Sequence, residues 1–304
     1  MINRNEHRGL CWIDLENPTN EEVRSIMNEF DLDPMVAEEL LLPSPKPKVE
    51  SYEHFIYLVL HFPAFKHTHT QGPSQEVDFI IGKKFLITAH YDTIDPLHKF
   101  SKVFEVNAIL DKEDIGEHAG FLFYHLLRKM YKAIEHELDF MRDELEDIEA
   151  NIFSGRENKM VSSLSEISRG LLNFKRAMSM HRPILESFEK VCSDFFGSDF
   201  SYRARTVLGS YHHIQNSIVS NLDSLMELRE TNNSLLATKQ NEIMKVITIM
   251  AFSTFPLALI ADIFGMGAVA TPLLGHPFDF WIILGLMGIV GLAFLAYFHR
   301  RGWL

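Results

Sequence analysis

Asp262 is the residue whose type and position point most directly to chemistry. It follows sixteen uncharged residues, 246–261, and interrupts an otherwise apolar segment. An ionisable side chain inside a membrane-spanning helix is costly, and it usually faces water or a partner group. Two interpretations are open for this carboxylate. Either it binds a cation in a water-filled path, or it is a structural group that is protonated or hydrogen-bonded to neighbouring helices.

Two pairs of histidines are the other candidates for chemistry. His67 and His69 are two residues apart, and His212 and His213 are adjacent. Such pairs hint at zinc, but neither comes with a second ligand pair at a spacing diagnostic of a zinc site, so solvated histidines are favoured. The sequence also contains no phosphate-binding glycine loop, nucleophile elbow or paired metal motif. We therefore expect that the protein is not an enzyme.

Two apolar segments near the C-terminus must position Asp262. The first, 246–261, reaches the roughly 20 residues needed to cross a bilayer only if its helix continues past Asp262. The second, 280–298, holds nineteen uncharged residues. Buried core helices of a soluble protein are the alternative, but such helices seldom run that far without a polar side chain. We expect membrane spans at 246–266 and 280–298, joined by an outer loop at 267–279.

The charges that flank these segments predict their orientation. The connecting loop has no Lys or Arg, whereas Lys245, Arg300 and Arg301 lie at the other ends of the two segments. By the positive-inside rule, both termini then lie in the cytoplasm. Trp281 and Trp303 fall near the two ends of the second segment, where indole rings favour the membrane interface. This predicts a multi-pass protein of the cell (inner) membrane with a basic cytoplasmic tail at 299–304.

The remainder of the chain is acidic. The formal net charge is −12, and residues 243–304 hold three basic and two acidic side chains, so residues 1–242 carry −13. An acidic surface attracts cations and repels both nucleic acid and the anionic inner leaflet, which argues against nucleic-acid binding and a peripheral lipid-binding role. Two cysteines cannot form a disulfide framework and are compatible with a reducing cytosol.

The sequence predicts three regions before the first span. Residues 1–116 form an α/β domain, with strands at 10–15, at 54–62 and within 76–90, the last with a turn at Gly82-Lys83. From residue 117 onward apolar residues recur at steps of three and four, which predicts a helical pair over 117–198, with a turn at 151–158 and an interruption at Pro183. A stalk helix follows at 199–245. The fold class is therefore an α+β cytoplasmic domain, a long stalk helix and a two-helix transmembrane hairpin.

The stalk helix is predicted to enter the first span without a break. Residues 210–255 contain neither Gly nor Pro, and these 46 positions could form a helix of roughly 70 Å. A solitary surface helix is one interpretation. Packing against copies of the chain is favoured, because a single two-span hairpin cannot enclose a pore and only an oligomer could.

Four stretches of the sequence resemble the CorA family of magnesium channels. They are PKVESYEHFIYLVLHFP at 47–63, NSLLATKQNEIMKVITIM at 233–250, IFGMG at 263–267 and HRRGWL at 299–304. The resemblance covers nearly the whole chain in the same order. It implies a homopentamer with an acidic cytoplasmic funnel, a pore lined by the first spans and an outer ring of second spans.

The resemblance also implies which residues line the pore, at steps of three and four along the first span: Asn241, Met244, Ile247, Ala251, Phe255, Ala258 and Asp262. The outer mouth is Gly265-Met266-Gly267, where the family has Gly-Met-Asn, so the amide that holds a hydrated cation is missing. Ala258 and Phe255 also depart from the family's usual residues. Asp262 stands where a small Gly is common, and we predict a ring of five Asp262 side chains as a substitute metal-cation site.

The resemblance implies Mg²⁺ uptake down the electrochemical gradient. Direct coordination by carboxylates would favour more easily dehydrated ions, so Zn²⁺, Co²⁺ or Ni²⁺ transport is one alternative, and a non-conducting sensor or scaffold is another. Arg300 and Arg301 either ring the cytoplasmic pore exit or anchor the span at the lipid headgroups. Family members are gated by cations bound between cytoplasmic domains, but Arg205-Thr206 replaces an Arg-Asp pair. We expect no covalent cofactor, the divalent cation as transported and regulatory ion, and other copies and membrane lipid as partners.

Overall fold

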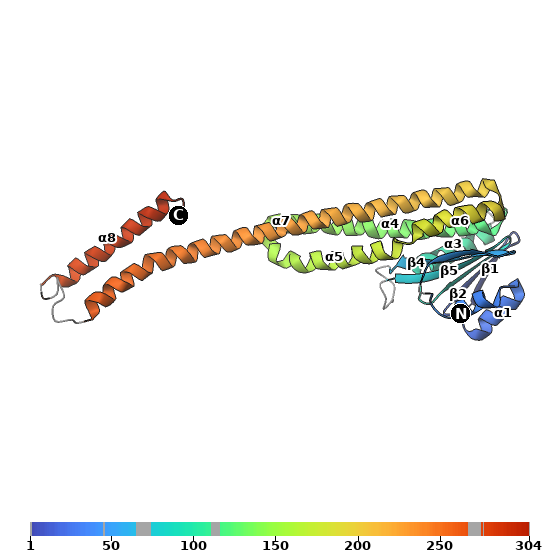
Figure 1. Cartoon of the computed structure of the whole chain (residues 1–304), viewed down its shortest axis with the longest axis horizontal. Coiled ribbons are helices and arrows are strands. Elements are labelled where there is room, and N and C mark those ends of the chain that lie inside the picture. Colours follow the sequence, from blue (N-terminus) through green and yellow to red (C-terminus); the bar gives the residue numbers. More distant parts are fainter. Residues whose placement is uncertain are drawn as a thin grey trace. The chain divides into compact units, whose positions relative to one another are not determined.

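A computed structural model describes residues 2–44, 46–64, 74–110, 116–266, 275 and 277–303 (Figure 1). The chain divides into two compact units, Met1–Arg229 and Glu230–Leu304. The boundary between the units falls inside one long helix, α7 (Ser198–Gly265). The predicted α+β domain, long helix and C-terminal apolar hairpin are all present.

A mixed sheet forms the centre of the first unit. Among the described residues six strands take part, in the order β1-β2-β6-β5-β4-β3. The β2–β6 pair is parallel and the other neighbours are antiparallel. Strands β4 and β5 are buried along almost their whole length, so the sheet needs cover on both faces. The strands are β1 (Ile2–His7), β2 (Leu10–Glu16), β3 (Lys48–Ser51), β4 (Phe55–Pro63), β5 (Ser74–Gly82) and β6 (Phe85–His90).

Helices cover the two faces of this sheet. Helices α1 (Asn20–Phe30) and α2 (Pro34–Glu39) pack on the face that carries Tyr57 and Ile80. The opposite face carries Trp12 and Phe79, which meet Phe100 of α3 and Phe123 of α4 at ring-centroid distances of 5.4 and 5.2 Å. This second layer consists of α3 (Asp95–Leu110), α4 (Ala119–Asn151), α5 (Glu157–Met178) and α6 (His181–Phe196) (Figure 1).

Local sequence signals fix several element ends. At the start of α1 the Thr19 hydroxyl accepts from the Glu22 N–H and the Glu22 carboxylate accepts from the Thr19 N–H, a capping box. Between α4 and α5 the short helix η1 (Ile152–Arg156) contains Gly155 at φ 85°, a backbone conformation that glycine adopts without steric cost.

The turn between β5 and β6 and the interruption between α5 and α6 lie at other residues than predicted. The β5–β6 turn consists of Lys83 and Lys84, because Gly82 is still paired within β5. The interruption between α5 and α6 falls at Ser179–Met180 rather than at Pro183. Proline is tolerated in the first turn of a helix, where its missing N–H has no intrahelical partner to lose, so Pro183 lies in the first turn of α6 without breaking the helix. Strand β1 and helix α3 had no corresponding prediction.

The apolar C-terminal segments form the end of α7 and a second helix, α8 (Asp279–Arg300). Both helices are long and apolar enough to cross a membrane. Helix α7 runs for 68 residues, so the predicted stalk enters the first span without interruption.

His181 joins the helical layer to the sheet in the first unit. Its Nδ1 accepts from the Tyr131 hydroxyl of α4 at 2.8 Å, and its Nε2 donates to the His61 carbonyl of β4 at 2.7 Å. Both ring nitrogens are therefore satisfied by the neutral imidazole. Complete burial lowers the pKa of His181 to about 4.

We expect acid to weaken this unit through His181. The unfolded chain takes up a proton near pH 6.5 while the folded chain resists protonation until about pH 4, so stability falls as the pH drops through this window. The loss should be about 3 kcal/mol at pH 4. Thermal denaturation of the full chain in detergent measures it. His181→Gln should flatten the pH dependence between 6.5 and 4, whereas His213→Gln, at an exposed position of α7, should not. Equal slopes for all three proteins would contradict this assignment.

Candidate functional site

One face of α7 within the second unit carries all the predicted pore-lining residues. Steps of three and four residues align them along the helix. Each of the seven is exposed in the chain: Asn241, Met244, Ile247, Ala251, Phe255, Ala258 and Asp262. Their side chains are therefore available to another copy of the chain or to a water-filled path, and the pore-lining role stays a prediction.

Another side of α7 faces α8. The Lys245 Nζ donates to the Gly302 carbonyl at 3.3 Å. A Cβ built on Gly291 of α8 would lie 3.9 Å from a methyl group of Leu257. Lys245 and Leu257 are half-buried, unlike the seven aligned residues. The hairpin thus distinguishes a covered side of α7 from an uncovered one.

Asp262 lies exposed near the end of this uncovered face. Its exposed neighbours Leu259, Ile263 and Met266 are apolar. The other acidic residue after position 242 is Asp279. It is the first residue of α8, and its Oδ1 accepts a hydrogen bond from the Phe280 N–H at 2.7 Å. Asp262 is therefore the carboxylate of this unit that is set within an apolar helix surface.

The two ends of the hairpin carry the remaining predicted site residues. Gly265 is the last residue of α7, Met266 follows it, and both are exposed. Gly267 lies outside the described residues. Arg300 ends α8, and Arg301 caps it with its guanidinium carbon 5.8 Å from the centre of the Tyr297 ring. The acidic and the basic residues of the hairpin thus occupy opposite ends of its helices.

No metal site is formed by the first unit's described residues. The part of the chain that the structure describes contains no group of three or more His, Cys, Asp or Glu side chains placed to hold a metal ion. Asp92, Asp194 and Asp199 are exposed. The Arg205 guanidinium pairs with Glu189 at 2.7 Å. His212 and His213 are exposed on α7, and His67 and His69 lie outside the described residues.

Glu76 and Asp78 form a buried pair of carboxylates that was not predicted from the sequence. Both side chains lie on one face of β5, and the side chain of Asp78 is fully buried. The Tyr57 hydroxyl donates to Asp78 Oδ2 at 3.4 Å, and within the described residues Asp78 Oδ1 has no hydrogen-bond partner. Glu76 Oε1 accepts from the Ser44 N–H at 2.8 Å, whereas its Oε2 lies 3.1 Å from the His61 Nε2 and, within the described residues, likewise has no hydrogen-bond partner. The alternation of acidic and apolar residues in EVDFIIG was the available signal.

Burial raises the pKa of Asp78 well above its ordinary value, and the negative charge of neighbouring Glu76 raises it further. Glu39 of α2 adds a third negative charge to these surroundings. Lys48 compensates Glu39 rather than Asp78, because its Nζ lies 2.7 Å from Glu39 Oε2. The folded chain therefore favours the protonated form of Asp78 more than the unfolded chain does.

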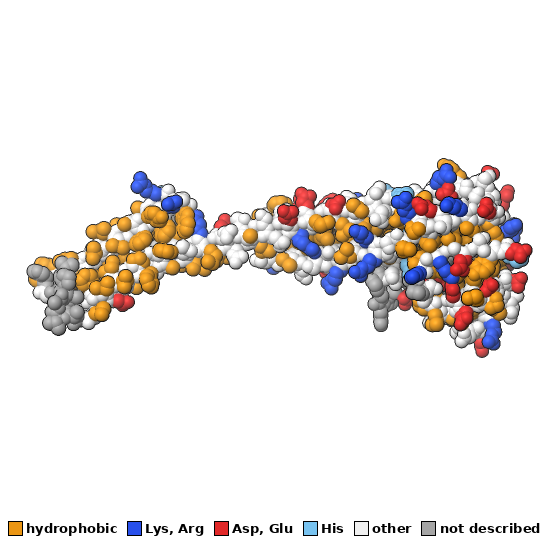
Figure 2. Space-filling model, viewed as in Figure 1, with side chains coloured by type: hydrophobic (Ala, Val, Ile, Leu, Met, Phe, Trp, Pro, Cys, Tyr) orange, Lys and Arg blue, Asp and Glu red, His pale blue; other side chains and the backbone are white. Residues whose placement is uncertain are grey.

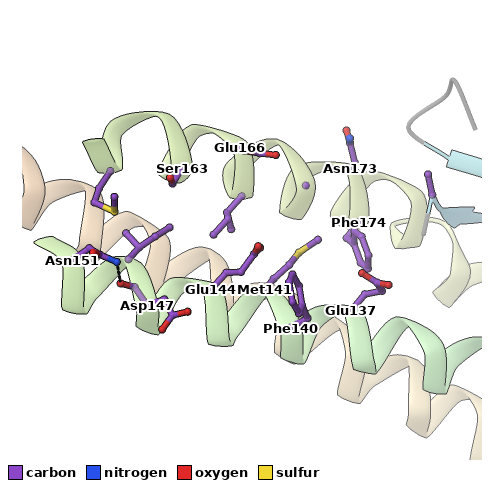
Figure 3. Close-up of a pocket in the computed structure, with 15 residues that line it drawn as sticks. Glu137, Phe140, Met141, Glu144, Asp147, Asn151, Ser163, Glu166, Asn173 and Phe174 are labelled. Carbon is purple, nitrogen blue, oxygen red and sulfur yellow. Dashed lines mark hydrogen bonds between the residues drawn. The ribbon is translucent and has the colours of Figure 1, made fainter. Parts of the chain in front are cut away.

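A groove with acidic walls lies between α4 and α5 in the first unit. It encloses about 500 Å³, and Glu137, Glu144, Asp147 and Glu166 line it beside Phe140 and Phe174 (Figure 3). Its carboxylates come from both helices, but they do not converge on a common point in the way that ligands of one metal ion do. The groove therefore contributes to the acidic surface of this unit and does not constitute a coordination site.

Comparison with known proteins relates these features to a family. The sequence matches the family described as "CorA-like Mg2+ transporter protein" over residues 7–300. It is 24% identical over 297 residues to the cobalt/magnesium transport protein CorA of Thermotoga maritima, covering 96% of this chain and 83% of that protein.

Two solved structures share the fold. The complete structure of the CorA magnesium transporter from Methanocaldococcus jannaschii matches with a TM-score of 0.84 and 22% identity, covering 99% of this chain and 93% of that one. The cytoplasmic domain of ZntB from Vibrio parahaemolyticus matches with a TM-score of 0.55 and 13% identity, covering 77% of this chain and 91% of that domain.

We expect Asp78→Asn to stabilise the first unit at alkaline pH. A carboxyl group whose pKa is higher in the folded chain than in the unfolded chain contributes stability at low pH and loses it as the pH rises through the folded value. An ionised carboxylate left without a donor costs on the order of 1–3 kcal/mol, and the amide avoids this cost. Thermal denaturation of the full chain between pH 4 and pH 9 provides the measurement. Asp92→Asn, at an exposed position, is the control. A wild-type and Asp78→Asn midpoint difference that does not change with pH would contradict the expectation.

Proposed function

Because the chain belongs to the family of CorA-like Mg²⁺ transporter proteins, we propose that it is a channel for divalent metal cations and that it takes up Mg²⁺ down its electrochemical gradient. The observation that carries the proposal is the uncovered face of α7, which aligns seven exposed side chains and ends in Asp262. A carboxylate at this depth of an apolar helix is stable when it faces water or a cation, and a conducting path provides both.

The channel is proposed to be a homopentamer in the cell (inner) membrane with both termini in the cytoplasm. A hairpin of two helices leaves the uncovered face of α7 exposed, and a ring of copies around an axis would place that face on a shared path. The absence of Lys and Arg from residues 267–279 and the presence of Arg300 and Arg301 at the other end support this orientation. The second helices would then lie outside the ring of first helices, on the side of the lipid.

Transport in this arrangement requires no chemical step. With the inside negative, a divalent cation gains about 4.6 kcal/mol per 100 mV on entry. Five Asp262 carboxylates close together would repel one another, and a divalent cation at the mouth would relieve that repulsion. Met244, Ile247 and Phe255 place apolar side chains deeper on the same face, where a narrow apolar segment can stop conduction by excluding water.

A second candidate is transport of Zn²⁺, Co²⁺ or Ni²⁺ by the same path. Asp262 favours it, because direct carboxylate coordination requires a cation to release water, which Mg²⁺ does reluctantly. The shared fold with the ZntB cytoplasmic domain is compatible with this candidate but does not select the ion. The choice between the two depends on the hydration state of the ion at Asp262.

Flux into liposomes tests the proposal. Purified full-length chain should load vesicles that contain a Mg²⁺-sensitive or Zn²⁺-sensitive dye faster than protein-free vesicles do, and an inside-negative potential should increase the rate. The order of the rates for Mg²⁺, Co²⁺, Ni²⁺ and Zn²⁺ identifies the preferred cargo. If no divalent cation enters above the protein-free rate, the chain is a non-conducting member of its family and the channel proposal fails.

Replacing Asp262 tests the proposed cation site. Asp262→Asn keeps the size of the side chain and removes its charge, so divalent flux relative to K⁺ flux should fall by at least about tenfold, equivalent to roughly 1.4 kcal/mol. Asp279→Asn removes the same charge from the start of α8 and serves as the matched control. Selectivity that is unchanged in Asp262→Asn, or reduced equally in both variants, would remove Asp262 from the mechanism.

A further inference from the structure

A groove lies between α7 and α8 at the basic end of the hairpin. It encloses about 560 Å³, and its walls are mainly aromatic. Phe252 comes from α7, Phe294, Tyr297 and Phe298 come from α8, and Trp303 and Arg301 follow α8. All of these residues belong to the second unit, so the groove is a feature of one compact part of the chain.

A helix C-cap builds the end of this groove. The Trp303 N–H donates to the Phe298 carbonyl at 3.0 Å, and the Gly302 N–H donates to the His299 carbonyl at 3.1 Å. Gly302 has a φ of 68°, so the chain turns back on itself in a Schellman motif. The Trp303 ring stacks on Phe298 at a centroid distance of 5.8 Å. Residues 301–303 are thereby held as a fixed wall of the groove.

The rim of the groove is basic. Arg301 lines the groove, and its guanidinium is held 5.8 Å from the centre of the Tyr297 ring. Lys245 of α7 is tied to the Gly302 carbonyl next to it. The range 243–304 contains two acidic residues, Asp262 and Asp279, and both lie at the opposite end of the two helices. Figure 2 shows the corresponding Lys and Arg side chains gathered beside an otherwise apolar surface.

The combination of an apolar cleft and a cationic rim selects the occupant. In a membrane the cleft opens at the depth where acyl chains begin, and Arg301 and Trp303 lie at the depth of the headgroups. Neighbouring copies in the proposed pentamer bring the same basic ends to one level, so their positive charges add and another copy does not neutralise them. An anionic headgroup neutralises those charges, and each basic side chain near an anionic membrane surface contributes to such binding.

We propose that this groove binds one anionic phospholipid per chain, with its phosphate at Arg301 and an acyl chain against Phe252, Phe294 and Phe298. The inference does not depend on cation conduction. It requires only that the hairpin crosses the bilayer. It gives Arg301 a different role from Arg300, which ends α8 and does not line the groove.

Fluorescence quenching of Trp303 tests the proposal. The full-length chain is placed in phosphatidylcholine vesicles that contain increasing fractions of brominated phosphatidylglycerol or brominated phosphatidylcholine. The signal of Trp303 is the part of the fluorescence that is lost in Trp303→Phe. We expect half-maximal quenching of Trp303 at an about fivefold lower fraction of the phosphatidylglycerol than of the phosphatidylcholine, as one basic contact would produce.

Two arginine variants separate a site from general surface charge. Arg301→Gln should abolish the preference for phosphatidylglycerol, whereas Arg300→Gln, which removes the same charge from the adjacent position, should retain most of it. An equal loss in both variants would assign the effect to diffuse surface charge and overturn the proposal. Quenching of Trp303 that is weak with both lipids would mean that another copy covers the groove, which also overturns it. Size-exclusion profiles in detergent confirm that each variant remains assembled as the wild type is.

Discussion

The position of Asp262 constrains the second unit more than any other feature does. A carboxylate that is exposed among apolar side chains is unfavourable in hydrocarbon, so the face of α7 that carries it cannot be turned to lipid. Helix α8 does not resolve this, because it faces a different side of α7. In the proposed channel, other copies of the chain provide the surroundings that its own two helices do not. Membership in the CorA-like Mg²⁺ transporter family fits this requirement, since it supplies the context of a transport path.

Two buried polar features characterise the first unit. One is a histidine that joins helices to the sheet, and the other is a pair of carboxylates. His181 uses both ring nitrogens to connect α6 with α4 and β4, which restricts how the helical layer can shift over the sheet. On the other face, Asp78 and Glu76 place two carboxylates in an apolar interior. These two buried features make the stability of the unit depend on pH.

The two ends of the hairpin have opposite chemistry, and the backbone explains part of the difference. One end holds Asp262 near the last turn of α7, and its surface is otherwise apolar. The other end holds Lys245 and Arg301 around a C-cap that Gly302 makes possible. Cations near the C-terminus of a helix interact favourably with its dipole, so the basic residues stabilise the end of α8.

The sequence by itself determined the two apolar helices, the unbroken α7, most of the strands and the place of Asp262 on one helical face. These features depend on periodicity, on hydrophobic length and on local hydrogen bonding, which act within a few residues or turns. Only the tertiary structure decided the strand order, the addition of β1 at the sheet edge, the cover of the sheet by α3, the burial of Asp78 beside Glu76 and the groove closed by Trp303. Each of these depends on contacts between residues far apart in the chain, and no local pattern specifies which distant surface a strand or a side chain will meet.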